Sequence, residues 1–82
     1  MKHFLLVYDR TAGKLVEQPH EYPDSERQRA IDDRFKREVV EIGRREIEVV
    51  VLGAESLEAL ARTHARYFTI ESTPKLPSEP AY

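Results

Sequence analysis

Two histidines, His3 and His20, are the side chains of this sequence that fit a metal site best. A four-residue hairpin loop that places Asp9 opposite Lys14 also places the two imidazoles opposite each other at the open end of the hairpin. Neighbouring imidazoles can bind zinc or nickel, or titrate as a coupled pair near neutral pH, and Glu21 is the nearest further ligand. Two exposed histidines at a strand end would give the same pattern, and we favour that interpretation.

Carboxylates raise a second chemical hypothesis, metal-dependent hydrolysis. Asp9 follows an apolar run and could meet Asp32 or Asp33 in the fold, but a nuclease needs several carboxylates that converge on paired metal ions. Each of these aspartates has a basic residue close by in the sequence, so a structural role is favoured. His64 lies on the apolar stripe of a predicted helix, where a histidine is more often a core-edge residue than a catalyst.

Signatures of other enzyme classes do not occur in the sequence. The chain has no cysteine nucleophile, no glycine-rich phosphate loop and no G-x-S-x-G turn. Gly53 stands alone between a predicted strand and a predicted helix, and one glycine does not make a nucleotide site. The sequence therefore predicts neither an enzyme nor a bound cofactor.

Nucleic-acid binding is a further hypothesis, because four arginines have few compensating carboxylates nearby: Arg44, Arg45, Arg62 and Arg66. They could form a small basic patch. However, 13 Lys and Arg stand against 15 Asp and Glu, which gives a formal net charge of −2. Proteins that bind phosphates normally carry a basic excess or stripe, so nucleic acid is the less favoured partner.

Two runs near the N-terminus predict a β-hairpin. Residues 3–9 are rich in apolar β-formers, and residues 14–18 form a shorter, more polar run. Gly13 between them can supply the positive φ of the turn. Pro19 cannot donate a ladder hydrogen bond, so the second strand should lie at an edge of the sheet and stop there.

A charged helix over residues 26–42 comes next. Its apolar residues recur at spacings of four, four and three: Ile31, Phe35, Val39 and Ile42. Such a stripe is typical of a helix that packs on one side. Ser25 and Gln28 fit a capping box at its start, and Gly43 fits a left-handed cap at its end.

The third strand and the last helix follow directly. Residues 46–52 begin with alternating glutamates and apolar residues and end in a continuous apolar run, which indicates burial on both faces. Ser56 is a suitable N-cap, and the apolar positions after it recur at helical spacing as far as about Phe68. This strand, turn and helix unit is the strongest structural signal in the chain.

The order β-β-α-β-α predicts one small α/β (α+β) domain over residues 1–68, with a three-stranded sheet in the order 2-1-3 packed with two helices. The connection through the first helix should make the second and third strands parallel to each other. Residues 69–82 contain three prolines and few apolar groups, and they are expected to form an extended or disordered tail.

The expected interface is an apolar sheet face. If both helices cover one face, the other exposes Leu5, Val7 and Val16, and a two-fold axis would bury this patch in both subunits. Helices on opposite faces would remove the patch. We therefore expect a protein-interaction or regulatory module, as a homodimer. No apolar run is long enough to span a membrane, and a chain without cysteine is cytoplasmic by default.

Overall fold

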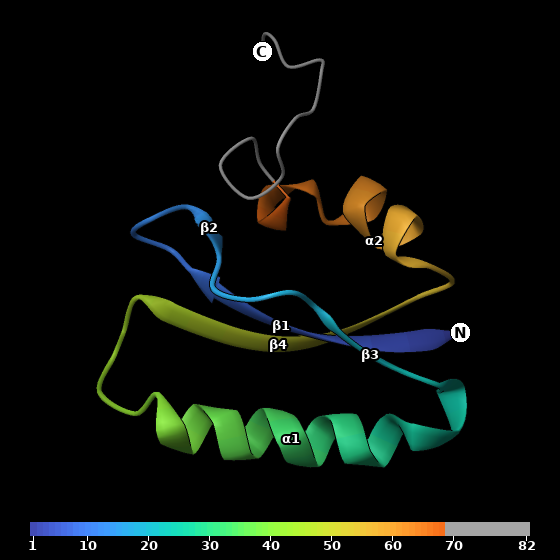
Figure 1. Cartoon of the computed structure of the whole chain (residues 1–82), viewed down its shortest axis with the longest axis horizontal. Helices are drawn as coiled ribbons and strands as arrows, with labels where there is room; N and C mark the ends of the chain where they lie inside the picture. Colours follow the sequence, from blue (N-terminus) through green and yellow to red (C-terminus); the bar gives the residue numbers. More distant parts are fainter. Residues whose placement is uncertain (69–82) are drawn as a thin grey trace, which may run out of the picture.

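The computed structural model describes residues 1–68, and the predicted tail, residues 69–82, lies outside the described residues. A sheet forms the middle layer, with one helix on each side of it (Figure 1). The elements in chain order are β1 (Lys2–Asp9), β2 (Lys14–Leu15), β3 (His20–Tyr22), α1 (Arg27–Val40), β4 (Ile47–Ala54) and α2 (Leu57–Thr63). Single turns of 3-10 helix lie before α1 and after α2, at Asp24–Glu26 and Ala65–Tyr67.

Strand β1 is the centre of the sheet, because each of the other described strands pairs with it. β2 and β3 follow one another along one side of β1, and β4 pairs along the other side. All three pairings are antiparallel, so β3 and β4 run in the same direction, as predicted. The α+β class and the strand order 2-1-3 are confirmed, with the second strand divided into two pieces.

The hairpin begins in the predicted register and then departs from it. Tyr8 is opposite Leu15, as predicted. Leu5 is opposite His20, whereas the predicted register places Leu5 opposite Gln18. Relative to the predicted register, the edge strand contains two additional residues around Pro19, which cannot donate a ladder hydrogen bond. Each side chain keeps its predicted face, because a shift of two equals the side-chain period of a strand.

The sheet separates two hydrophobic clusters, because alternate side chains of a strand point to opposite faces. The cluster on the α2 side contains Phe4, Leu6, Tyr8, Ala54, Leu60, Tyr67 and Phe68. The cluster on the α1 side contains Leu5, Val7, Tyr22, Ala30 and Val49. The two helices thus cover opposite faces of the sheet (Figure 1).

The expectation that Leu5 and Val7 lie on an open face is wrong. They are 5% and 1% exposed, because α1 covers the face that they share. Val16, the third residue of the expected patch, is 48% exposed beside the hairpin. Leu5 and Val7 are therefore core residues of the described domain.

Capping explains where the helices begin and end. Ser56 caps α2 as predicted, since its hydroxyl accepts a hydrogen bond from the Ala59 N–H at 3.1 Å. The capping box predicted at Ser25 does not form, because the chain makes a 3-10 turn after Pro23 and α1 starts without a side-chain cap. Gly43 follows α1 with a φ of 90°, the left-handed conformation predicted there.

Leu60 of α2 is fully buried, so its truncation tests the α2-side core. Leu60→Ala should lower the free energy of unfolding by about 2–5 kcal/mol, because it removes buried surface and leaves a cavity. Val16→Ala is the control and should change it by less than about 0.5 kcal/mol. Urea denaturation followed by circular dichroism measures both, and equal losses would contradict the described core.

Candidate functional site

The structure separates the two histidines of the metal hypothesis. His3 pairs with Tyr22 across the ladder, so it does not face His20. The His20 ring instead lies 2.5 Å from Glu17 through its Nε2. His3 Nε2 is buried without a hydrogen bond, 3.5 Å from Asp24 Oδ1. Residues 1–68 contain no group of three or more His, Asp or Glu that could hold a metal ion.

The aspartates of the hydrolase hypothesis each have a separate partner. Asp9 Oδ1 accepts hydrogen bonds at 2.9 and 3.0 Å from two backbone N–H groups of the β1–β2 turn. Asp33 accepts the hydroxyl of Tyr22 at 2.8 Å, and Asp32 accepts the side-chain amide of Gln28 at 3.1 Å. These carboxylates stabilise a turn and a helix and do not converge on a common point.

Two of the four arginines of the nucleic-acid hypothesis are engaged by carboxylates. Arg66 donates to both oxygens of Glu48, at 3.0 and 2.8 Å, and stacks over a tyrosine ring. Arg44 donates to two glutamates at 3.2 and 3.3 Å. Arg45 and Arg62 are exposed. The predicted basic patch is therefore about half neutralised by its own surroundings.

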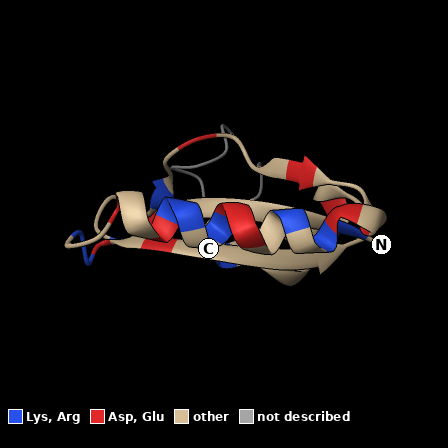
Figure 2. Cartoon of the chain, turned by 90° about the horizontal axis from the view of Figure 1, so that it is seen from below, with Lys and Arg blue, Asp and Glu red and all other residues tan. Residues whose placement is uncertain are grey.

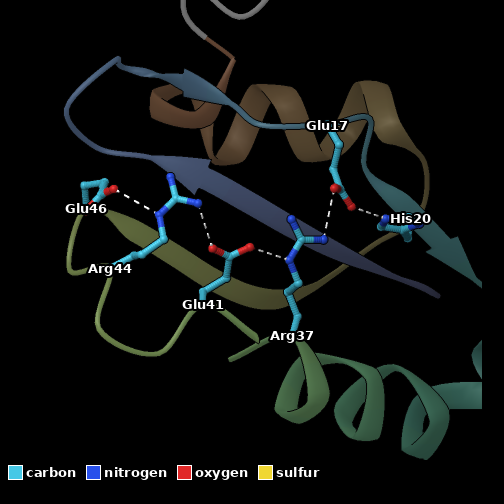
Figure 3. Close-up of polar contacts among 6 residues, drawn as sticks. All are labelled: Glu17, His20, Arg37, Glu41, Arg44 and Glu46. Atoms are coloured by element: carbon cyan, nitrogen blue, oxygen red, sulfur yellow. Dashed lines mark hydrogen bonds and ion pairs between the residues drawn. The ribbon is translucent and has the colours of Figure 1, made fainter. Parts of the chain in front are cut away.

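A chain of polar contacts fixes the C-terminal half of α1 to the rest of the domain (Figure 3). It runs through His20, Glu17, Arg37, Glu41, Arg44 and Glu46. Arg37 is its centre, with donor distances of 2.9 Å to Glu17 and 2.8 Å to Glu41. The side chains of Arg37 and Glu41 are only 25% and 11% exposed. Charged residues thus occupy inward positions of α1 where apolar residues were expected.

These contacts shift the ionisation of the groups that make them. The hydrogen bond with His20 is the largest cause that lowers the pKa of Glu17; burial opposes it, and Arg37 adds to it. The hydrogen bond with Glu41 is the main cause that raises the pKa of Arg37. Glu17 and Arg37 are therefore both charged at neutral pH and form an ion pair.

An open cleft of about 300 Å³ lies between α1 and β3, lined by Leu5, His20, Tyr22, Asp33, Lys36, Arg37 and Val40. Burial and the hydrogen bond to Asp33 raise the pKa of Tyr22 to about 12, so its hydroxyl keeps its proton at neutral pH. Within the cleft Tyr22 bonds Asp33, while His20 and Arg37 both bond Glu17 beside it.

Three of the four residues of the predicted apolar stripe face away from the sheet, which corrects the sequence-based expectation, whereas Ile31 is half-buried. Phe35, Val39 and Ile42 are 66%, 54% and 80% exposed, whereas Ala30 is fully buried. At 3.6 residues per turn Phe35 and Val39 lie about 140° and 180° around the helix from Ala30, and Ile42 follows two residues after the end of α1 at Val40. We call Phe35, Val39 and Ile42 the α1 stripe. Viewed from the α1 side, charged residues of both signs alternate along the helix (Figure 2).

Hydrogen-bond directions in the sheet alternate, because antiparallel pairing uses the N–H and C=O of every second residue. The N–H of Arg10, just after β1, donates to the carbonyl of Glu46 at 2.8 Å, on the β4 side. The N–H of Val16 donates to the carbonyl of Val7 at 2.8 Å, on the hairpin side. Even-numbered residues of β1 therefore bond β4, and odd-numbered residues bond β2 and β3.

The same alternation leaves half of the β4 peptide groups without a strand partner in the described part of the chain. Even-numbered residues of β1 pair with even-numbered residues of β4, as Leu6 does with Val50. The N–H and C=O groups of Val49, Val51 and Gly53 consequently point outward, where no described strand pairs with β4. We call these outward groups the open edge.

The two sides of the sheet differ in their protection against further strand pairing. Proteins blunt exposed edges with short strands, extra residues, proline and lysine. The hairpin side has strands of two and three residues, a two-residue insertion, Lys14 and Pro19. β4 has eight residues in unbroken register with β1 and contains neither proline nor lysine. β4 thus lacks the features that protect the hairpin side against pairing with another strand.

Sequence reasoning found the strand over residues 46–52 but missed both candidate surfaces. The open edge could have been recognised from the sequence. Pro19 and Lys14 indicate that the hairpin strand lies at an edge, and the strand over residues 47–54 contains neither residue type. The outward α1 stripe left no such signal. Spacing alone shows that Phe35 and Val39 share a side of the helix, and it does not show which side meets the sheet.

The contact network predicts how stability falls in acid. Since the pKa of Glu17 is lowered below 4.5, its ionised form stabilises the fold above that pH, and this stabilisation is lost as the pH falls through the folded-state pKa. Between about pH 5 and 3, wild type should lose stability more steeply than Glu17→Gln. Urea unfolding across this range measures the difference. Glu55→Gln, at an exposed carboxylate, is the control and should follow wild type; parallel curves for wild type and Glu17→Gln would contradict the network.

Comparison of the chain with protein-family models, with curated proteins and with solved structures finds no match. Among residues 1–68, no helix is long and apolar enough to cross a membrane. The open edge and the α1 stripe are the exposed surfaces of the described residues on which the functional proposal rests.

Proposed function

We propose that this chain is a small protein-interaction module that docks a strand of its partner on the open edge. The unprotected eight-residue strand β4 is the observation that carries the proposal. In such a complex, main-chain hydrogen bonds from Val49, Val51 and Gly53 provide affinity, and the alternate side chains of the added strand provide specificity. The module regulates its partner by holding or masking that strand and needs no reaction of its own.

The α1 stripe supports the same proposal from a second surface. Phe35 and Ile42 expose large apolar groups to water in a domain whose two cores are small. Contiguous exposed apolar surface in a small domain is typical of an interaction site. A partner that reaches from the open edge over the outer side of α1 would bury both surfaces in one interface.

The compartment is inferred from composition, and the two alternative functions depend on the contacts of their candidate residues. We place the module in the cytoplasm, since the chain has no cysteine that would indicate an oxidising compartment. No specific contact favours nucleic-acid association, because Arg44 and Arg66 are bound to glutamates. Metal-dependent hydrolysis has no support either, because His3 and His20 lie in different surroundings.

Proline substitution can separate the two sides of β4. Val51→Pro removes an outward N–H and places its ring at the open edge, so the ladder with β1 should persist while partner binding is lost. Val50→Pro is the matched control, since it removes an N–H that bonds β1 and should cost at least about 1–3 kcal/mol of stability. Urea denaturation of the two purified variants measures this contrast.

Partner binding is measured by size-exclusion chromatography of extracts from the source cells, with the chain detected at its native level. Wild type should elute in an assembly larger than the 9.6 kDa monomer, and Val51→Pro should elute as the monomer. Wild type that elutes only as a free monomer would contradict the proposed function. A Val51→Pro chain that stays in the assembly would show that the partner does not use the open edge.

A further inference from the structure

We infer that the partner on the open edge is a second copy of this chain, whose β4 lies antiparallel to the first across a two-fold axis perpendicular to the sheet. The inference rests on the proposed strand-docking function and names its partner. A two-fold axis lets one self-complementary surface serve both subunits. In this arrangement Val49 and Val51 lie opposite odd-numbered residues of β4 in the second copy. The outward N–H groups of each β4 then meet the outward C=O groups of the other along the whole edge.

The position of α1 fits this arrangement. α1 packs over β1 and β4, and it runs roughly along the strands in both views (Figures 1 and 2). Strands in a sheet are about 4.8 Å apart, so a helix over the β1–β4 pair lies about 5 Å from a two-fold axis beside β4. The two copies of α1 would then be about 10 Å apart, which is the spacing of packed helices.

The α1 stripe points toward this helix–helix contact. Val40 lines the cleft beside β3 with Leu5 and Tyr22, so its direction marks the hairpin side of α1. Phe35 lies about 140° around the helix from Val40, and therefore faces outward and toward the β4 side. Formation of the continuous sheet would bring the two stripes together and bury the apolar surface that a single copy exposes.

The charges beside the stripe are self-complementary under the same axis. Arg34 and Glu38 flank the stripe on the β4 side of α1, whereas Lys36 lines the cleft on the hairpin side. A two-fold axis sets the Arg34–Glu38 flank against the same flank of the other helix, running in the opposite direction. Arg34 then faces Glu38 of the second copy, and Glu38 faces Arg34. Opposite charges at spacing four thus match without any like-charge contact.

Sedimentation equilibrium of the purified 82-residue chain tests the inference directly. Wild type should have twice the monomer mass at micromolar concentration, and Val51→Pro should be monomeric. Phe35→Ser should dissociate at least about tenfold more readily, because an apolar anchor of the interface is lost. Wild type that stays monomeric at high micromolar concentration overturns the inference. The proposed function would still stand if the extract contained a larger assembly, so the two failures are distinguishable.

Charge reversal tests the helix–helix contact and needs no change to the sheet. Arg34→Glu gives a flank with two negative residues, and Glu38→Arg gives a flank with two positive residues. Each variant alone should self-associate at least about tenfold more weakly, whereas an equimolar mixture should associate like wild type. Arg29→Glu is the control and should dimerise normally, since Arg29 lies over the Tyr22 ring on the hairpin side. Single variants that dimerise like wild type, or a mixture that does not recover, would overturn the contact.

Discussion

Eight consecutive antiparallel pairs between β1 and β4 are the interaction on which the rest of this structure depends. The pairing fixes a period of two along both strands, so that adjacent residues such as Phe4 and Leu5 enter different hydrophobic clusters. Each face of the sheet is then apolar and must be covered, which places one helix on each side. The same alternation sends the peptide groups of Val49, Val51 and Gly53 to the side of β4 away from β1.

The distribution of charge on α1 is the second determinant of the surface. Arg37 and Glu41 face the domain and join it to the hairpin and to the start of β4, so ion pairs hold this end of the helix in place. Because these inward positions are charged, the apolar side chains Phe35 and Val39 are left outside. Partly buried ion pairs add little to stability but constrain geometry. We interpret the network as the feature that orients α1 with its apolar stripe outward.

Much of the fold could be predicted from the sequence because it depends on local signals. The Gly13 turn, the Ser56 cap and the end of α1 before Gly43 are each set by a few neighbouring residues. The last helix was predicted to reach about Phe68, but α2 ends at Thr63, where the chain turns into a 3-10 segment.

The parts that could not be predicted depend on tertiary choices. The interrupted edge strand brings His20 opposite Leu5, and no residue type near Pro19 specifies an insertion of two. Leu5 and Val7 are core residues only because a helix packs on their face of the sheet. Composition alone does not determine which face of the sheet each helix covers. For the candidate site, the sequence contained β4 and the stripe residues, but their exposure follows from strand order and helix rotation.

Amide hydrogen exchange along β4, measured at several protein concentrations, tests the central claim most directly. A two-fold sheet predicts that the amides of Val49, Val51 and Gly53 exchange slowly in concentrated solution and quickly on dilution. The amides of Val50 and Leu52, which bond β1, should be protected at every concentration. Fast exchange of the outward amides at all concentrations, or protection that dilution does not change, would contradict a dimer built on the open edge.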